Sequence, residues 1–439
     1  MPHLDLPGGV HMRYERMSSS DPDPGAHDKP LLVVVVPFTS APISTLPQLH
    51  HSSLLRHRYD IVALAPRSHG ETIAPITAGS DHYVAAAELA LAYEALRLPP
   101  CPLYAPSMIC GRIALAFTIL FPNLVTSLAL AGLGTRRPRR SMAQLVGFCE
   151  LAVSGDDAEI VVEMFTELAT TLGGQGQTEE QRDVLVKFLL RQGGPRRTKH
   201  SYERMVMWYR EANLPGSALG EIRQPILLLY GANDDDSLPD NDDWPVLLCG
   251  SKRVQTELIP DTNKLCWLQA PAAVNQHILD FFSEAEPPTS SEPASPDLET
   301  ALSTLASVCH EPSVRDRDPS DPQSFSALTT EELEARREAL VRVQASEDTW
   351  CAKHEAPDPW DVPSPSSSVD ESERWSPRDT NERDLASTTS PPLVSPPLVS
   401  ETVTIEVNVV PESIRPGVKP DQLRKQSVVS VESDKSGDP

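Results

Sequence analysis

The sequence predicts an α/β fold, in which a mostly parallel sheet carries helices on both faces. Two short runs, 31–36 and 225–230, consist almost wholly of Leu, Ile and Val, the pattern of strands that are buried on both sides. A longer Ala- and Leu-rich stretch, 82–98, is helical in pattern. Strands that alternate with helices at this spacing form right-handed crossovers, and these produce a parallel sheet.

The expected elements follow one another closely along the first two thirds of the chain. A hairpin comes first, with two short strands around the Gly8-Gly9 turn. Between 135 and 223 the pattern is helical without strands, which predicts a helical cap inserted into the sheet domain. The other strands are expected at 31–36, 60–65, 103–105, 124–130, 225–230 and 254–259, and the other helices at 82–98, from 113 to the stop at Pro122, and at 270–282.

The composition changes abruptly after Phe282. About 17 of the 24 net negative charges lie beyond it, in sequence rich in Pro and Ser. We therefore expect a domain over 1–283 and a mostly disordered acidic tail over 284–439. Two stretches interrupt this tail, a possible helix at 329–345 that begins with a Thr329/Glu332 capping box and a possible strand at 402–410. They are either transient elements or peptides that dock onto a protein partner.

Charge and cysteine usage exclude several classes of function. A net charge of −24 argues against direct binding to nucleic acid or anionic membranes. The longest apolar run, 31–36, is too short to span a bilayer, and the first residues lack the basic and apolar regions of a secretory signal. The 7 cysteines are dispersed without metal-ligand spacing. These features predict a cytoplasmic protein with reduced thiols, no metal site and no cofactor.

Three motifs carry a resemblance to the α/β-hydrolases, over residues 3–282. The stretch 106–115 reads Pro-Ser-Met-Ile-Cys-Gly-Arg-Ile-Ala-Leu, and a common form of that family's nucleophile turn reads Gly-His-Ser-Met-Gly-Gly-Arg-Ile-Ala-Leu. The stretch 59–72 is similar to the family's Asp-x-Arg-Gly-x-Gly-x-Ser loop and keeps Arg67. The stretch 259–271 resembles its closing Ile-Pro-x-x-Gly-His-x-x-x-x-Glu-x-Pro. The resemblance implies the α/β-hydrolase fold.

The same resemblance implies a degraded catalytic triad. The family's chemistry needs a nucleophile, a histidine that activates it and a carboxylate that orients the histidine. In the gapless register these positions are held by Met108, Lys264 and Asp234. A thioether has no proton to lose, and a lysine is normally charged at neutral pH, so neither residue suits its role. We expect the Lys264 ammonium to pair with Asp234 instead.

The loop that should hold the oxyanion is also altered. Where the family has His-Gly after its first long strand, this chain has Val36-Pro37, and proline offers no backbone N–H. The glycines expected two residues before and after the nucleophile are Pro106 and Cys110. The sequence therefore predicts a non-catalytic hydrolase-fold protein that binds a small molecule or a protein. Under the cap, Pro37, Phe38 and Trp267, together with Met108, could line a pocket for a small apolar ligand.

Two alternatives remain open. The first is an active hydrolase of small ester, amide or epoxide substrates with a relocated nucleophile, either Ser107 after a one-residue slip or the Cys110 thiol. The slip would place the β-branched Ile109 where the family has a glycine. The second is a domain that mainly carries an interaction tail. The nearby histidines, His69, His82 and His277, are interpreted as packing or surface residues.

Overall fold

The computed structural model describes residues 2–17, 29–37, 46–50, 53–134, 158–173, 179, 182–183, 185–187, 189, 198–203, 214–234, 243–285 and 292–353. Structural statements below concern these residues. Phe38, most of the predicted cap over 135–223 and the predicted strand at 402–410 lie outside them. Within them, no helix combines the length and the apolar character that a membrane crossing requires.

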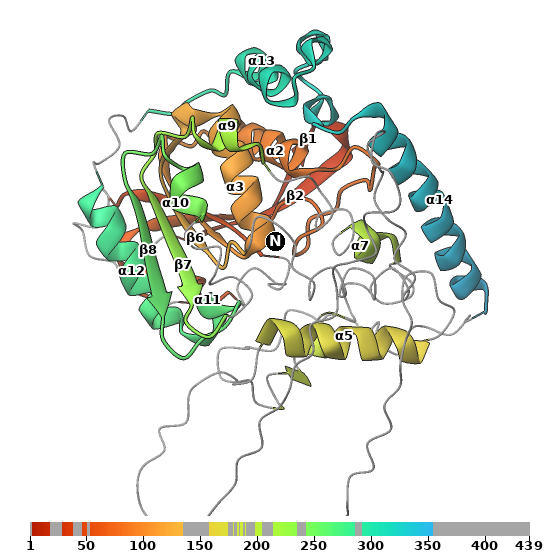
Figure 1. Ribbon diagram of the computed structural model, residues 1–439, viewed down its shortest axis with the longest axis horizontal. Helices are drawn as coiled ribbons and strands as arrows, with labels where there is room; N and C mark the ends of the chain where they lie inside the picture. Colours follow the sequence, from red (N-terminus) through yellow and green to blue (C-terminus); the bar gives the residue numbers. More distant parts are fainter. Residues whose placement is uncertain are drawn as a thin grey trace, which may run out of the picture. The chain divides into compact units, whose positions relative to one another are not determined.

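The described strands form one sheet in the order β1-β2-β4-β3-β5-β6-β7-β8 (Figure 1). β1 and β2 pair as a hairpin, β2 runs antiparallel to β4, and all later neighbours are parallel. This confirms the predicted mostly parallel sheet. The strands are β1 (His3–Leu6), β2 (Val10–Met17), β3 (Leu31–Val35), β4 (Asp60–Leu64), β5 (Cys101–Pro106), β6 (Val125–Ala131), β7 (Ile226–Gly231) and β8 (Val254–Ile259).

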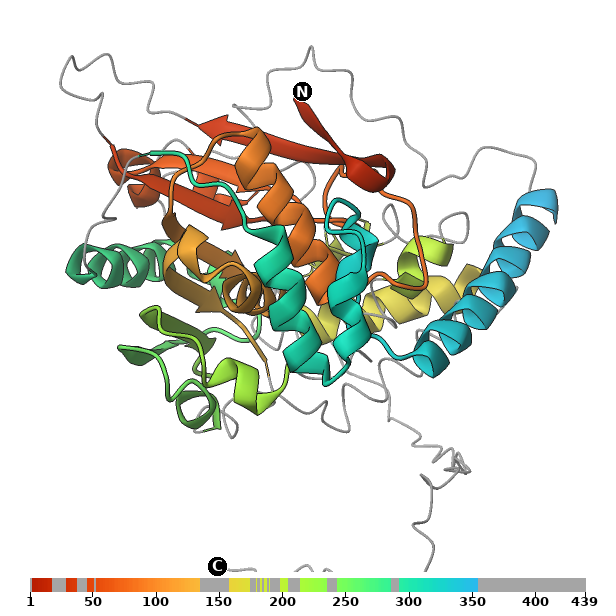
Figure 2. The same ribbon diagram turned by 90° about the horizontal axis from the view of Figure 1, so that it is seen from above.

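The strand order determines which helix covers which face. The chain steps from β3 to β4 in one direction, and from β4 over β3 to β5 and β6 in the other. Because such crossovers are right-handed, α1 lies on one face and α2 and α3 on the opposite one. α12 packs on α1, and α2 packs on α3 (Figure 2). The helices are α1 (Leu54–Arg58), α2 (His82–Ala95), α3 (Met108–Leu120), α5 (Ala158–Gly173), α7 (Thr198–Tyr202), α9 (Gly216–Leu219), α10 (Asp243–Leu247), α11 (Cys266–Gln269), α12 (Pro271–Glu284), α13 (Leu298–Cys309) and α14 (Thr330–Lys353).

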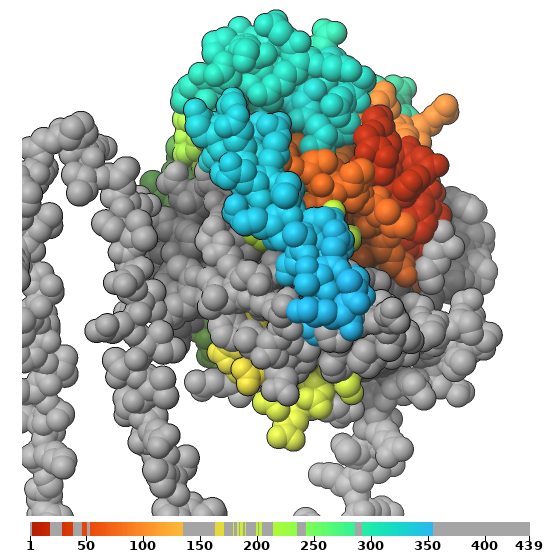
Figure 3. Space-filling view, turned by 90° about the vertical axis from the view of Figure 1, so that its right-hand side faces the viewer, coloured from red at the N-terminus to blue at the C-terminus, as the bar shows by residue number. Residues whose placement is uncertain are grey.

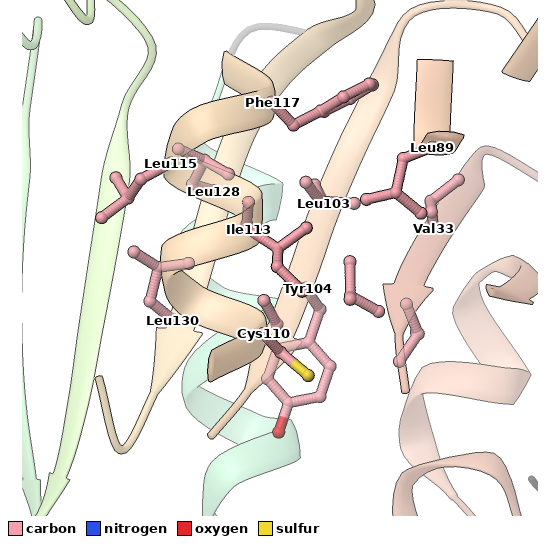
Figure 4. Packing of buried hydrophobic residues seen from close by; sticks show 14 of the residues in the cluster. Val33, Leu89, Leu103, Tyr104, Cys110, Ile113, Leu115, Phe117, Leu128 and Leu130 are labelled. Carbon is pink, nitrogen blue, oxygen red and sulfur yellow. The ribbon is translucent and has the colours of Figure 1, made fainter. Parts of the chain in front are cut away.

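The core lies between the central strands and α3. Val33, Leu103 and Leu128 come from three neighbouring strands, and Ile113 and Phe117 of α3 pack in the same cluster (Figure 4). Residues 109–118 are all buried, so α3 is covered on every side. An element buried in this way needs apolar residues around its whole circumference, which its sequence supplies.

The packed structure continues beyond the predicted domain boundary at 283. Residues 292–353 form α13, the 3-10 turns η9 (Pro312–Asp316) and η10 (Pro322–Phe325), and α14, and they belong to the same compact unit as the sheet. Leu302 and Leu305 of α13 are buried, and the Phe325 ring lies 6.3 Å from that of Phe121. The expected disorder from 284 onward is therefore wrong for this segment, because apolar side chains at helical spacing bury it against the core.

The helix predicted at 329–345 is present as α14 and is longer than expected. Its capping box is formed, since the Thr329 hydroxyl accepts from the Glu332 amide at 3.2 Å and the Glu332 carboxylate accepts from the Thr329 amide at 2.9 Å. Figure 3 shows α14 in blue along the surface, continuous with the teal segment that contains α13.

Replacing Leu305 by Ala tests whether α13 is part of the folded domain. The Leu305 side chain is fully buried, so the change should lower the free energy of unfolding by about 2–5 kcal/mol. Ser303→Ala, on the exposed side of the same helix, is the matched control and should stay within about 0.5 kcal/mol. Urea unfolding of the full chain measures both, and equal small effects would show that α13 contributes no packing.

Candidate functional site at the carboxyl end of β5

The sharp turn between β5 and α3 reverses at Ser107. β5 ends at Pro106 and α3 begins at Met108, and the residue between them has φ 84° and ψ 157°. The Ser107 amide donates to the Ala131 carbonyl at 2.7 Å, which fixes the turn to β6. A non-glycine residue with such backbone angles costs about 1–3 kcal/mol, so the surrounding structure must hold it there.

The strained residue of the turn lies one position before the one that the gapless register assigns to the nucleophile. The gapless register places Met108 at the nucleophile position, whereas the positive φ belongs to Ser107 and Met108 is the first residue of α3. Met108 is half-buried against Gly134, where an added Cβ would lie 2.9 Å from the Met108 sulfur. Ile109 is the β-branched residue that spoke against placing the nucleophile at Ser107. Its side chain is buried in the core.

Gly111 is the position at which α3 packs most closely against Leu133. A Cβ there would meet a Leu133 methyl group at 2.6 Å, so only glycine fits without a shift. This glycine stands four residues after Ser107. In the motif quoted above, the glycine that precedes the arginine stands three residues after the nucleophile, so the turn and the close-packed glycine are spaced one residue further apart in this chain.

The Ser107 hydroxyl acts as the N-cap of α3. Ser107 is buried, and its Oγ accepts a hydrogen bond from the Cys110 amide at 3.4 Å. Serine is a preferred residue at this position because its oxygen satisfies one of the free amides of the first turn. Within the described residues, the Ser107 side chain makes this hydrogen bond to the backbone of Cys110. No hydrogen bond there joins it to a histidine.

The Cys110 thiol is held in its neutral form. It is completely buried and donates to the Val36 carbonyl at 3.5 Å. Burial raises the pKa of Cys110 to about 12, although the Ser107 side chain lowers it in part. A thiol with this pKa carries almost no thiolate near neutral pH, and thiolate is the reactive form.

A buried phenol lies next to this thiol. Tyr104 of β5 extends its ring past Cys110 (Figure 4), and its hydroxyl has no hydrogen-bond partner among the described residues. Burial raises the pKa of Tyr104 well above its ordinary value, and the thiols of Cys266 and Cys110 raise it further. The group is therefore uncharged near neutral pH.

The two described residues after β3, Val36 and Pro37, offer no free amide to an oxyanion. The Val36 amide already donates to the Leu64 carbonyl at 2.8 Å, and Pro37 is buried and has no N–H. Trp267, the other predicted pocket residue, is buried in α11, where its ring would lie 2.7 Å from a Cβ on Gly132. Gln48 donates to the Trp267 carbonyl at 2.6 Å and fixes the backbone of α11.

The acid and histidine positions lie on two loops that touch. Asp234 is buried in the turn after β7, and half-buried Lys264 lies in the turn that precedes α11. The backbones of these turns meet, since the Asn233 amide donates to the Thr262 carbonyl at 2.9 Å and a Cβ on Gly231 would lie 2.2 Å from the Asn263 carbonyl oxygen. Pairing of the Lys264 ammonium with Asp234 stays a prediction.

A second polar cluster follows β4 and was missed by sequence reasoning. Arg67 is almost fully buried, and its Nε and Nη2 donate to the Glu88 carboxylate at 3.0 and 2.6 Å. Ser68, which has φ 60°, donates through its hydroxyl to the buried Glu203 carboxylate. Burial opposes the charge on Arg67, but Glu88, Glu203 and Asp81 outweigh it, so the pKa of Arg67 is raised.

The sequence indicated Arg67 as part of a family motif. It did not indicate its partners, Glu88 and Glu203, which lie 21 and 136 residues further along the chain. Of the histidines singled out, His69 is buried with its Nδ1 2.8 Å from the Arg67 carbonyl, and His82 is buried at the start of α2. Burial, followed by the charge of Arg112, lowers the pKa of His82. No group of three or more metal-ligating side chains is assembled in the described part of the chain.

Glycine substitutions test which residue has the strained backbone. Ser107→Gly should change the free energy of unfolding by less than about 1 kcal/mol, because relief of strain offsets the lost cap. Met108→Gly should cost about 1 kcal/mol or more, since glycine is poor in a helix and the contact with Gly134 is lost. Chemical denaturation compares the two variants. The reverse order of stabilities would place the apex at Met108.

Buried thiols predict how stability depends on pH. The pKa of Cys101, Cys110 and Cys266 is raised by burial from 9.0 to about 12 in each case. Their contribution to stability is complete below pH 9 and is lost as the pH rises toward 12, at about 1.4 kcal/mol per pH unit for each thiol. Urea unfolding between about pH 8 and pH 10.5 should show this fall, with a shallower slope in Cys110→Ala. An unchanged slope would mean that Cys110 ionises normally in the folded protein.

The comparisons with known proteins agree with this architecture. No family model matches the sequence, and no curated protein matches it. Among solved structures, the chain is similar to an esterase, EaEST, from Exiguobacterium antarcticum, with a TM-score of 0.52 and 15% identity over 64% of this chain and 99% of the esterase.

Two further structures show the same likeness. The enol-lactonase from Burkholderia xenovorans LB400 has a TM-score of 0.51 and 14% identity, and the match covers 64% of this chain and all of the lactonase. Est816, described as an N-acyl homoserine lactone degrading enzyme, has a TM-score of 0.50 and 16% identity over 64% of this chain and 100% of that enzyme. Likeness at this identity concerns the fold, and together with the sheet order it shows that this chain has the α/β-hydrolase fold.

Proposed function

We propose that this chain is a non-catalytic α/β-hydrolase-fold protein that serves as a binding module. The observation that carries the proposal is the state of Ser107. Its hydroxyl stands at the apex of the turn and accepts a hydrogen bond from the first turn of its own helix, and no hydrogen bond of the described residues joins it to a histidine. A serine becomes a nucleophile when an adjacent base takes that proton.

The position that resembles the family's histidine supports the same conclusion. Lys264 stands there in sequence, and an ammonium group has no lone pair with which to accept a proton. A lysine at this position therefore does not supply the proton acceptor that the family's histidine provides.

The thiol alternative is weakened by the chemistry of Cys110. A nucleophilic cysteine has a lowered pKa and partial exposure, whereas Cys110 is fully buried and its pKa is raised to about 12. The loop after β3 adds a second obstacle. Its Val36 amide is already bonded and Pro37 has none, so these two residues offer no donor for an oxyanion.

One observation favours the second candidate, an active serine hydrolase that uses Ser107 on small ester or amide substrates. A strained non-glycine residue between strand and helix is the feature on which this fold mounts its nucleophile. Strain alone does not supply a proton acceptor, however. A serine N-cap on a turn of this shape accounts for the same geometry without chemistry.

The binding role rests on fold and composition. The occupant is a small apolar ligand under the cap, beside Trp267, or a protein partner of the acidic C-terminal region. The cytoplasm is the proposed compartment, since the six described cysteines are free thiols.

A serine-directed fluorophosphonate tests the proposal. The full chain should show no adduct by intact mass, and its turnover of short acyl esters should equal that of Ser107→Ala, while an active serine esterase of the same fold serves as positive control. A stoichiometric adduct on Ser107 that disappears in Ser107→Ala, together with ester turnover above background, would establish the active hydrolase instead.

A further inference from the structure

The C-terminal segment 292–353 touches two parts of the molecule that are far apart in sequence. Its first half packs on α2 and α3 of the sheet domain, and α14 reaches α7 of the predicted cap (Figure 1). Contacts of α14 with α7 are among the more extensive helix–helix contacts of the described chain. The segment therefore connects α7 to the sheet domain.

The first anchor of this segment is the N-terminus of α2. The Asp81 carboxylate accepts from the Ala327 amide at 2.7 Å and from the Ser326 hydroxyl at 3.2 Å. Arg336, in the second turn of α14, donates to the Ser80 carbonyl at 2.8 Å. Asp81 is fully buried and also caps α2 through the Val84 amide at 2.8 Å, so the anchor is built into the domain.

The second anchor joins α14 to α7. The Glu347 carboxylate accepts from the Lys199 amide, in the first turn of α7, at 3.1 Å. A carboxylate at this place satisfies a free amide and interacts favourably with the helix dipole. Arg336 and Glu347 are eleven residues apart, so α14 spans about 16 Å between its two anchors.

The other end of α7 is held by the loop after β4. Glu203 directly follows α7, and its carboxylate accepts from Ser68 and lies 3.9 Å from Arg67. Arg67 donates in turn to the Ser80 hydroxyl, and the Ser80 carbonyl accepts from Arg336. The contacts therefore form a closed circuit from the β4 loop through α2, α14 and α7 back to the β4 loop.

The two halves of the segment are held with different strength. α13 buries Ala301, Leu302, Leu305 and Ala306, whereas α14 buries only Ala339 and Val343 along its length. A helix that buries so little apolar surface belongs to the elements of low local stability. α14 therefore has less apolar burial to lose on release than α13 has.

We propose that residues 292–353 form an intramolecular strap, in which α13 is the fixed base and α14 the releasable arm that holds α7 against the loop after β4. This loop and Ser107 both follow strands whose carboxyl ends lie at the same edge of the parallel sheet. Release of α14 loosens α7 and opens this edge. The strap stands whether or not Ser107 is catalytic.

Hydrogen–deuterium exchange of the full chain tests the strap. The double variant Arg336→Ala/Glu347→Ala removes both polar anchors of α14. Peptides that cover α7 and residues 66–72 should exchange about tenfold faster, because a charge-assisted hydrogen bond is lost, while peptides of β5 and α13 keep their protection. Arg337→Ala/Glu334→Ala, on the exposed side of the same helix, is the matched control and should leave α7 unchanged.

Single variants keep the test decisive if the double variant is unstable. Glu347→Gln retains an amide oxygen that can accept from Lys199 and should leave α7 close to wild type, whereas Glu347→Ala should expose it. Faster exchange in α14 with unchanged α7 would overturn the proposal. Equal acceleration in the control pair, or loss of protection in β5 in every anchor variant, would also overturn it, since α14 would then act as general support.

Discussion

The whole arrangement depends on one backbone constraint, the reversal of the chain at Ser107. β5 lies at the centre of the sheet and α3 is buried on every side, so the connection between them must turn within a single residue. The positive φ of Ser107 makes this possible, and the bond from its amide to Ala131 fixes the turn to β6. Gly111 then lets α3 approach Leu133 closely. The positions of α2 and α13, which pack on α3, follow from this placement.

The sheet could be predicted because its signals are local. Each central strand is an apolar run of about the right length, and the alternation with helices fixes the parallel arrangement. Aligning the family motif with this sequence could not locate the apex of the turn. The alignment is anchored on Gly111 and Arg112, and the number of residues between the turn and this glycine differs here. The signal that could have found the apex is the serine itself, a preferred N-cap directly before an apolar helical pattern.

The C-terminal segment shows how average composition hides local pattern. Charge and proline counts over 284–439 describe a disordered chain, but 15 of its 20 prolines lie outside the segment that packs. Within 298–309, Ala301, Leu302, Leu305 and Ala306 recur at helical spacing, and Asp297 accepts from the Thr300 amide as an N-cap. Its burial against α3 could not be predicted, because nothing local in the sequence states which surface of the domain is left uncovered.

The polar contacts around Arg67 explain why a strap on α7 can be reversible. Two carboxylates, Glu88 and Glu203, face one buried guanidinium, and Glu88 holds it with the shorter contacts. If α7 leaves, Arg67 keeps Glu88 as its partner, so no buried charge is abandoned, and Glu203 regains water. Such an exchange of protein for water contacts has a small net free energy, unlike the burial of the apolar side chains of α13. The core and α13 therefore stay folded when the cap contact opens, and the edge of the sheet that carries Ser107 becomes the part of the domain that α14 controls.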